Sequence, residues 1–356
     1  MGYFARLSWG VLSSYSSLKP SISEDGIIFS FFFTGYIISQ IPAGFLADKF
    51  SPKYIIGAAM LGLAFATGLS GLAWTVTVET LASFATGFAA GWVYSPTVKV
   101  LASLFRKREL SVAVGYYSLA WPLSIILTGL VLPPLASSAG WRAPYYILAA
   151  LSLVIAALVF STGQSRVVRE KIDFLVIRDP NVILLSVGGF AFYFAYWLLA
   201  LYAYLYLLTL GLSNTEAGLV YSMLAVAGLP STVISGHIMR RIGAKWTLSS
   251  SVVIYASLLL VFSFIKSIYG LLLVATVMGF FRFMITPAGT TVASLVGGPE
   301  KTGSVNGMTN FFAQASGAVG PLAASVIIER LGYNAVWFLA FGLSVLAAFM
   351  FARLKV

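Results

Sequence analysis

The sequence predicts an all-α polytopic membrane protein, with twelve transmembrane helices arranged as two pseudo-symmetric six-helix bundles. Three observations support this fold class. The chain of 356 residues is 59% hydrophobic and only 9% charged, whereas a soluble domain carries about 25% charged residues. Its apolar runs are roughly 20 residues long, the length at which a helix crosses the hydrocarbon core. One pattern of glycines and charges occurs twice, once in each half of the chain.

Helices rather than a barrel are expected for these runs. Backbone groups in lipid must be paired within their own segment, which favours helices. The strands of a membrane barrel would alternate between apolar and polar residues, and these runs do not alternate.

The twelve predicted helices are separated by charged breaks or by breaks rich in glycine and proline. They are expected at 1–18, 26–48, 54–74, 79–104, 110–133, 142–162, 181–210, 215–238, 247–265, 268–296, 303–328 and 333–352. The first half is therefore 1–162 and the second half is 181–356. The charged stretch 163–180 is predicted to be a cytoplasmic linker between them.

The two halves are related by an internal repeat with an offset of 192 residues. SEDG at 23–26 recurs as TEAG at 215–218, GFLADKFSPK at 44–53 as GHIMRRIGAK at 236–245, and GWRA at 140–143 as GYNA at 332–335. In the fourth and tenth helices the offset is 191, which pairs Pro96 with Pro287. Two parallel halves related by an axis along the membrane normal are typical of transporters, whose substrate site lies between the halves near mid-membrane.

The basic residues are unevenly distributed between the two sides of the membrane. Four of the 22 lie in one set of loops: Lys19, Arg142, Lys266 and Arg330. Fifteen lie in the alternate loops and tails: Lys49, Lys53, Arg106, Lys107, Arg108, Arg166, Arg169, Lys171, Arg178, Arg240, Arg241, Lys245, Lys301, Arg353 and Lys355. This bias predicts that both termini are cytoplasmic. It explains the net charge of +11 without a nucleic-acid partner, and a plasma-membrane location is expected.

The segment GFLADKFSPK resembles the signature loop of the major facilitator superfamily, G-x-L-a-D-r-x-G-r-[RK]. Its matching residues are Gly44, Leu46, Asp48, Lys49 and Lys53, and Ser51 replaces the second glycine. SGHIMRRIGAK resembles a degenerate second copy, with Gly236, Arg240 and Arg241. The resemblance implies that these loops gate the inward side. Asp48 is suited to the role because charge-assisted hydrogen bonds are strong yet reversible, although an ordinary topogenic loop would also carry such charges.

Most of the first half is similar to the anion:cation symporter branch of that superfamily. The similarity covers YFAR at 3–6, the segment 21–48, the segment 95–118 and GWR at 140–142. It implies that Arg6 on the first helix, with Tyr3 and Tyr36 beside it, holds an anionic substrate. It also implies a role in the site for Asn310 on the eleventh helix.

Three basic residues fall within predicted membrane spans: Arg6, Lys99 and Arg282. A charge at bilayer depth is costly and therefore marks a candidate functional site. Arg282 lies halfway along the tenth helix, whereas Lys99 has a stem long enough to reach the inner interface. The alternatives are pairing of Arg282 with helix carbonyls and a cytoplasmic anchor for Arg6.

The eleven acidic residues fall at loops or at the ends of spans, and none is expected at mid-membrane. Ala5 and Ala90 stand where the resembling branch often has an aspartate and a glutamate, and Ser83 replaces a frequent arginine. Coupling to protons usually needs a protonatable carboxylate. The sequence therefore favours an exchanger or uniporter at least as strongly as a proton symporter, and the coupling ion stays open.

Other polar and aromatic residues are weaker candidates. Gln314 shares a helix face with Asn310 at i, i+4, and hydrogen bonding between helices would explain both amides equally well. The seventh helix carries nine aromatic residues from Phe190 to Tyr206. Tyr193 is a candidate cavity residue, but packing against lipid and an interfacial belt are expected for most of the nine.

The sequence thus predicts a secondary active or facilitative transporter that moves a small organic anion by alternating access, with Arg6 and Arg282 clamping the anion. An exporter of amphipathic or neutral compounds and a non-transporting membrane sensor are the alternatives. An enzyme is not expected: there is no cysteine, the one histidine, His237, lies in a basic loop, and no nucleotide or metal motif is evident. No cofactor is predicted, the partners are the substrate and the lipid bilayer, and a monomer is expected.

Overall fold

The computed structural model describes residues 1–46, 50–104, 116–163 and 174–355. Within these residues nine helices are long and apolar enough to cross a membrane. The chain divides into two compact units, Met1–Glu170 and Lys171–Val356. The predicted linker lies partly outside the described residues, and the predicted domain boundaries stay a prediction.

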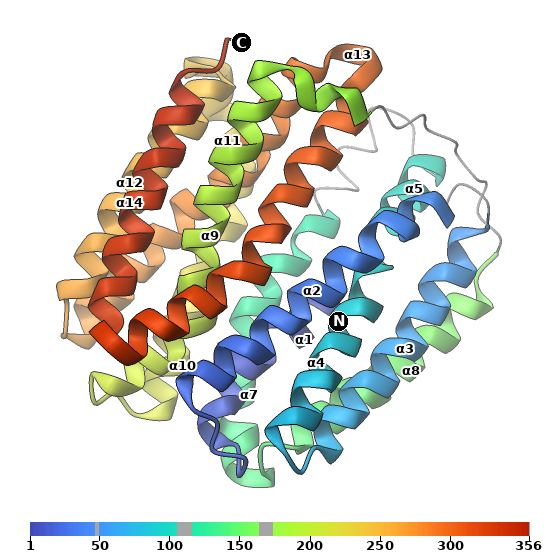
Figure 1. The fold of residues 1–356 in the computed structure, drawn as a ribbon, viewed down its shortest axis with the longest axis vertical. Helices are drawn as coiled ribbons and strands as arrows, with labels where there is room; N and C mark the ends of the chain where they lie inside the picture. Colours follow the sequence, from blue (N-terminus) through green and yellow to red (C-terminus); the bar gives the residue numbers. More distant parts are fainter. Residues whose placement is uncertain (47–49, 105–115, 164–173, 356) are drawn as a thin grey trace. The chain divides into compact units, whose positions relative to one another are not determined.

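The first unit is built from helices that run along one another (Figure 1). They are α1 (Gly2–Leu12), the short 3-10 helix η1 (Ser13–Tyr15), α2 (Ile22–Leu46), α3 (Pro52–Leu72), α4 (Val76–Gly91), α5 (Tyr94–Leu104), α7 (Ala120–Ala139) and α8 (Ala143–Ser161). The most extensive packing is between α2 and α4, α3 and α8, and α3 and α4, while α1 packs mainly against α7.

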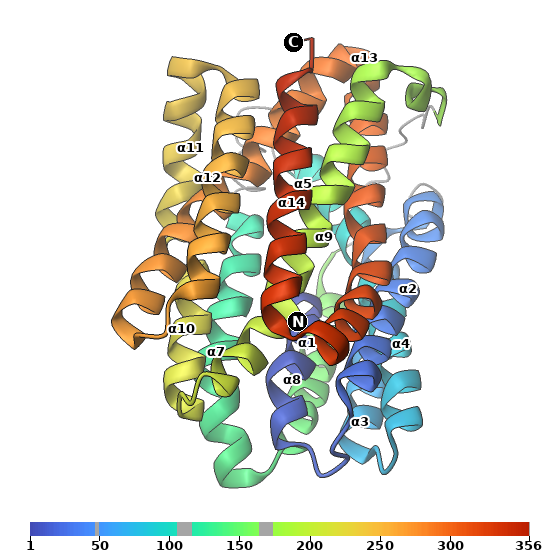
Figure 2. The same ribbon diagram turned by 60° about the vertical axis from the view of Figure 1, so that its left-hand side comes forward.

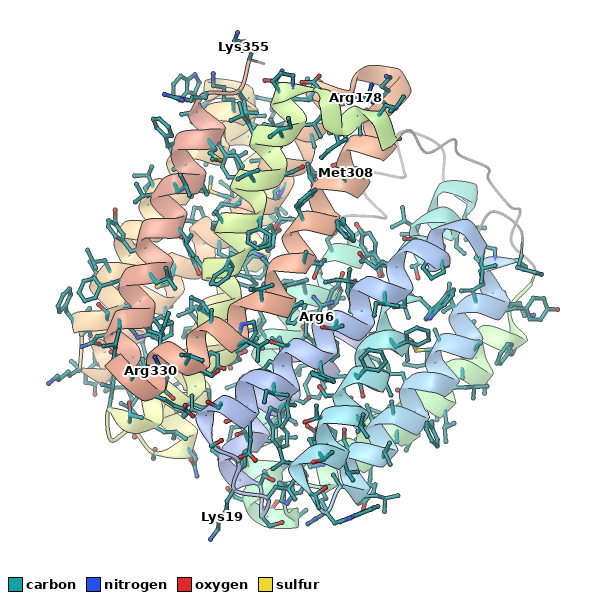
Figure 3. All side chains as sticks on the ribbon, viewed as in Figure 1. Arg6, Lys19, Arg178, Met308, Arg330 and Lys355 are labelled. Carbon is teal, nitrogen blue, oxygen red and sulfur yellow. The ribbon has the colours of Figure 1, made fainter. Side chains whose placement is uncertain are left out.

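The second unit has the same kind of arrangement (Figure 2). It contains η2 (Phe174–Arg178), α9 (Pro180–Thr209), α10 (Asn214–Val226), α11 (Gly228–Ile242), α12 (Ala244–Phe264), α13 (Ile268–Leu331) and α14 (Tyr333–Ala352). α13 turns at Gly298, whose φ is 59°, and so supplies two spans, Ile268–Gly298 and Lys301–Leu331. In this unit Arg178 and Lys355 lie at one end and Arg330 at the other (Figure 3).

Helix ends follow local signals in the sequence. Thr75 caps α4 by accepting a hydrogen bond from the Val78 amide. Ser213 and Glu216 form a capping box at α10, which satisfies two backbone donors that the helix leaves open. Gly140 ends α7 with φ 84°, a conformation that other residues adopt only at a cost.

The closest helix packing depends on glycines. A Cβ on Gly87 of α4 would lie 1.9 Å from the Phe32 carbonyl oxygen of α2. The repeat-related Gly279 of α13 would place a Cβ 2.5 Å from the carbonyl oxygen of Leu224. Both contacts let two backbones approach without a side chain between them, as is common in membrane helix packing.

Specific contacts between side chain and backbone also follow the repeat. Lys53 Nζ donates to the Thr162 carbonyl oxygen at 2.5 Å, and Lys245 Nζ donates to the Leu354 carbonyl oxygen at 2.6 Å. Each lysine is 192 residues from its counterpart, and so is each acceptor. Both lysines were predicted to lie in loops. Each connects the start of one helix, α3 or α12, to the end of the last helix of its unit, α8 or α14.

Several predicted boundaries need correction. The fifth span was expected to end at 133, but α7 continues through Pro133 and Pro134 to Ala139. The fourth span breaks between α4 and α5, and the eighth breaks at Ala227 between α10 and α11. Hydropathy does not reveal these breaks because apolar residues continue on both sides of each break.

The expected lipid-facing position of most aromatic residues on α9 is wrong. Six of the nine are buried: Phe192, Tyr196, Trp197, Tyr202, Tyr204 and Tyr206. Tyr202 donates to the Pro321 carbonyl oxygen at 3.0 Å and Tyr206 to that of Ser263 at 3.1 Å. α9 packs against α13 and α14 of its own unit, so these rings form the core of the second unit.

Candidate functional site

Arg6 lies on α1 and is almost completely buried in the first unit, with 3% of its surface exposed. Figure 3 shows it far from Lys19, which lies at the end of the same unit. Its guanidinium carbon is surrounded by five aromatic rings, at 5.6 Å from Tyr3, 5.4 Å from Phe32, 5.1 Å from Phe33, 4.3 Å from Tyr36 and 5.5 Å from Trp121. We call these rings the Arg6 cage.

The Arg6 cage is assembled from three helices. Tyr3 precedes Arg6 by one turn on α1, Phe32 and Tyr36 lie one turn apart on α2, and Trp121 of α7 packs against Tyr3 with ring centroids 4.8 Å apart. Aromatic faces attract a guanidinium group without neutralising its charge. The cage therefore keeps a cation inside the unit.

Arg282 has a similar environment in the second unit, with 3% of its surface exposed. Its guanidinium carbon lies 3.9 Å from the ring of Tyr196, 5.1 Å from Tyr193, 5.5 Å from Phe192 and 5.6 Å from Phe283. Its Nη1 donates to Thr286 Oγ1 at 2.9 Å, one turn further along α13. We call these residues the Arg282 cage, which α9 and α13 build.

The structure brings some of the predicted site residues together and leaves others apart. Tyr3 and Tyr36 lie in the Arg6 cage, and Tyr193 lies in the Arg282 cage. Gln314 is buried and its amide donates to Asn310 Oδ1 at 3.5 Å, so these two amides contact each other on α13. Lys99 lies on α5, and its side chain is outside the described residues.

Sequence reasoning missed several members of the two cages. Phe32, Phe33, Trp121, Tyr196 and Thr286 were not singled out, although two of them carried a usable signal. Phe32 precedes Tyr36 by four positions, and Thr286 follows Arg282 by four. Residues at that spacing share one helix face, so each lies beside a residue that the sequence had already identified.

The predicted gating residues are only partly described. Asp48 and Lys49 lie outside the described residues, and Gly44 is in the last turns of α2. Lys53 Nζ donates a hydrogen bond to the carbonyl oxygen of Thr162. Gly236, Arg240 and Arg241 lie near the end of α11, where both arginines are exposed and favourably placed for the helix dipole.

Two of the acidic residues expected at the ends of spans are buried in the first unit. Asp25 is 3% exposed and Glu79 is 1% exposed. Both lie in the first turn of a helix, α2 and α4 respectively, as a residue at the end of a span does. In the part of the chain that the structure describes, no group of three or more His, Cys, Asp or Glu could hold a metal ion.

Comparison with known families identifies the class of protein. The family model of the Major Facilitator Superfamily matches residues 1–243 and 185–356. Because these matches together span the chain, the chain belongs to the Major Facilitator Superfamily. It is therefore a multi-pass membrane protein of a transporter class, not an enzyme.

Curated relatives agree with the branch that the sequence resembles. The chain is 23% identical to the probable galactarate/D-glucarate transporter GudP of Bacillus subtilis, over 86% of this chain and 78% of that protein. It is 23% identical to the hexuronate transporter of Bacillus subtilis, over 94% of this chain and 86% of that protein. It is 24% identical to the probable galactarate/D-glucarate transporter GarP of Escherichia coli, over 89% and 83%.

Solved structures confirm the fold class. A mutant of the nucleoside transporter NupG has a TM-score of 0.82 at 14% identity, covering 100% of this chain and 98% of that chain. A bacterial homolog of the human lysosomal transporter Spinster has a TM-score of 0.78 at 16% identity, covering 99% and 91%. At these identities the similarity concerns the fold alone.

Proposed function

We propose that this chain transports a small organic anion of the sugar-acid type by alternating access, with Arg6 and Arg282 binding the anion. The observation that carries the proposal is that each unit buries one arginine in an aromatic cage. Relatives named as galactarate/D-glucarate and hexuronate transporters support the substrate class. These substrates carry one or two carboxylates and several hydroxyl groups.

The chemistry of the two cages suits such a substrate. A guanidinium group stays protonated and binds a carboxylate through two parallel hydrogen bonds. Aromatic walls exclude water, which strengthens these bonds, and they attract the guanidinium group without neutralising its charge. In the Arg6 cage, Tyr3 and Tyr36 add phenolic hydroxyl groups that can hydrogen-bond to substrate hydroxyls.

The orientation in the membrane belongs to the same proposal. Both termini are cytoplasmic, the chain lies in the plasma membrane as a monomer, and the loops that carry Asp48 and Arg240 gate the inward side. The distribution of basic residues supports this orientation. Because the chain has no cysteine, the variants Lys19→Cys and Arg178→Cys can each be labelled at one site. An impermeant maleimide should label the first in intact cells and the second only after permeabilisation, and the reverse pattern would refute the orientation.

The substrate proposal is tested by the thermal stability of the purified protein with D-glucarate, galactarate, hexuronates, organic phosphates, neutral sugars and hydrophobic cations. A ligand of the folded state stabilises by about 2.7 kcal/mol at a hundredfold excess over Kd. We expect stabilisation by sugar acids that Arg6→Gln and Arg282→Gln abolish. The control variants Lys19→Gln and Arg330→Gln change exposed charges in the same units and should keep the response.

The opposite result would favour another function. Stabilisation by neutral or cationic hydrophobic compounds alone would indicate an exporter. The burial of the α9 aromatic residues in the core of their own unit argues against a site for such compounds there. Binding of an anion without flux in proteoliposomes would indicate a sensor.

A further inference from the structure

Glu79 is buried in the first unit, and its hydrogen-bond partners among the described residues are neutral. Its Oε1 accepts hydrogen bonds from Ser70 Oγ of α3 at 3.2 Å and from the Tyr145 hydroxyl of α8 at 3.5 Å. Its Oε2 is buried and has no hydrogen-bond partner among the described residues. An ionised carboxylate in such surroundings is strongly disfavoured, and the group binds a proton instead.

Asp25 is the second buried acid, and its partners are also neutral. Trp9 Nε1 donates to its Oδ1 at 2.7 Å, and Ser13 Oγ lies 2.7 Å and 2.8 Å from its two oxygens. Both acids lie in the first turn of a helix, which favours a negative charge, and the short bonds at Asp25 favour it further. Asp25 is therefore well provided with donors, whereas one oxygen of Glu79 has none.

A row of aromatic rings connects the two carboxyl groups. Trp9, which donates to Asp25, packs edge-to-face on Trp141 with centroids 6.2 Å apart, and Trp141 packs in the same way on Tyr145, also at 6.2 Å. The Tyr145 hydroxyl donates to Glu79 Oε1 at 3.5 Å. We call Trp9, Asp25, Glu79, Trp141 and Tyr145, with Ser13 and Ser70, the acid cluster.

The charged groups on the helices around the acid cluster contact groups other than the two buried carboxyls. On α2, Glu24 lies beside Asp25 and bonds to Ser21. Next to α8, Arg142 donates to the Ala73 carbonyl oxygen at 2.9 Å and lies over the Trp141 ring. On α1, Arg6 is held in its own cage. No basic side chain in the described part of the chain pairs with either buried carboxyl.

The second unit shows that the fold does not require these acids. At the offset of 192, which also relates the Gly87–Phe32 contact of α4 to the Gly279–Leu224 contact of α13, Ser70 becomes Phe262, Glu79 becomes Leu271, Trp141 becomes Tyr333, Tyr145 becomes Trp337 and Asp25 becomes Ala217. Phe262 and Trp337 lie with centroids 6.3 Å apart, and Tyr333 and Trp337 at 6.4 Å. The same location is thus an apolar core in one half and an acid-containing cluster in the other.

We propose that Glu79 binds the coupling proton of this transporter, with Asp25 and Tyr145 as positioning residues. The proposal rests on the transport function proposed above. It assigns the proton site to the first unit although Ala5 and Ala90 stand where the resembling branch often has an aspartate and a glutamate. A metal cation fits less well, because only two carboxyl groups are present and the indole N–H of Trp9 can only donate.

α1 provides a physical connection between substrate and proton. Arg6, Trp9 and Ser13 follow one another at i, i+3 and i+7 and therefore share a face of this segment. Movement of α1 when an anion binds Arg6 would displace the donors of Asp25 and shift Trp9 against Trp141. The charge on Asp25 would then be less stabilised and Tyr145 would be displaced. Both changes would alter the proton affinity of Glu79. The proton moves to or from water, and no covalent bond between heavy atoms changes.

The test measures D-glucarate uptake into proteoliposomes with the membrane potential clamped near zero. If one proton moves with each anion, accumulation can reach about tenfold for each unit of pH difference. We expect an inward pH gradient to drive uptake by the unaltered protein. In Glu79→Gln this accumulation should be lost, while exchange of D-glucarate without a gradient continues. The matched control is Glu24→Gln, which retains a capping side chain and should keep pH-driven accumulation.

Three outcomes decide between the proposals. Retention of pH-driven accumulation in Glu79→Gln would overturn the proton site, as would accumulation driven by a sodium gradient at equal pH. Absence of D-glucarate exchange in the unaltered protein would count against the transport proposal instead. The proton site then still has its own readout in the purified protein. An infrared carbonyl band of a protonated carboxyl should be present at acidic pH, and Glu79→Gln should remove it while Glu24→Gln should not.

Discussion

The two halves of this transporter share their hydrogen bonds at helix ends but differ in one part of the interior. Lys53 and Lys245 hold equivalent carbonyl oxygens, at 2.5 Å and 2.6 Å. Glu79 of the first half has hydroxyl partners from Ser70 and Tyr145, whereas the repeat-related residues Phe262 and Trp337 of the second half pack ring against ring. Contacts present in both halves serve the fold that both must adopt. A polar cluster present in one half points to a task that only this half performs.

The buried arginines also break the repeat. Residue 198, the counterpart of Arg6 in the second half, is a leucine, and Arg282 corresponds to Ala90 or Gly91 in the first half. Each half therefore places its cation on a different helix, α1 or α13.

The largest expected effect comes from introducing a carboxyl group into the second half, at the position equivalent to Glu79. Leu271→Glu places a carboxyl at a completely buried position and should destabilise the protein by about 4 kcal/mol. The control Leu271→Met keeps the volume and should cost less than about 1.5 kcal/mol. The measurement is thermal unfolding in detergent. Tolerance of Leu271→Glu would mean that the second half also has room for an acid cluster.

The arginine cages should matter for transport more than for stability. We expect Arg6→Gln and Arg282→Gln each to lower D-glucarate exchange by about a hundredfold, because about 2.7 kcal/mol of charge-assisted bonding is lost. The measurement is the initial rate of exchange in proteoliposomes. Unequal effects would show that one half dominates binding, and normal rates in both variants would refute the cages as substrate sites.

Helix packing should be tighter in the first half than in the second. Gly87→Ala forces a methyl group into the Phe32 carbonyl oxygen and should cost about 3 kcal/mol, against about 2 kcal/mol for Gly279→Ala, where the clearance is larger. Thermal unfolding of both variants measures the difference. As a control, Gly342→Ala lies in open space and should leave the unfolding midpoint nearly unchanged. A larger loss for Gly279→Ala would reverse the comparison.

The smallest effects are expected where the halves agree. Lys53→Met and Lys245→Met each remove one hydrogen bond from a charged donor to a partly accessible carbonyl and should cost about 1 kcal/mol each. The two values, obtained from thermal unfolding, should be equal within error. A clear inequality would show that one of the two contacts does more than hold the helix ends together.

Much of the fold and of the candidate site could be predicted from the sequence. Runs of apolar residues, the repeat at 192 residues and the position of Arg282 halfway along a run are local facts, and the cost of a charge in lipid makes them informative. The neighbours Tyr3 and Tyr36 of Arg6 were anticipated from the resemblance to a known branch. Most of these features can be recognised along the chain, because the thickness of the hydrocarbon core sets the length of a spanning helix.

Burial was decided only by the tertiary structure. An acid in the first turn of a helix can face water or protein, and only the packing of α1, α3 and α8 encloses Asp25 and Glu79. In the same way, the aromatic residues of α9 would suit lipid as well as a protein core. Lipid and protein interior are similarly apolar, so hydropathy determines that a segment crosses the membrane, while the neighbouring helices determine what each of its faces contacts.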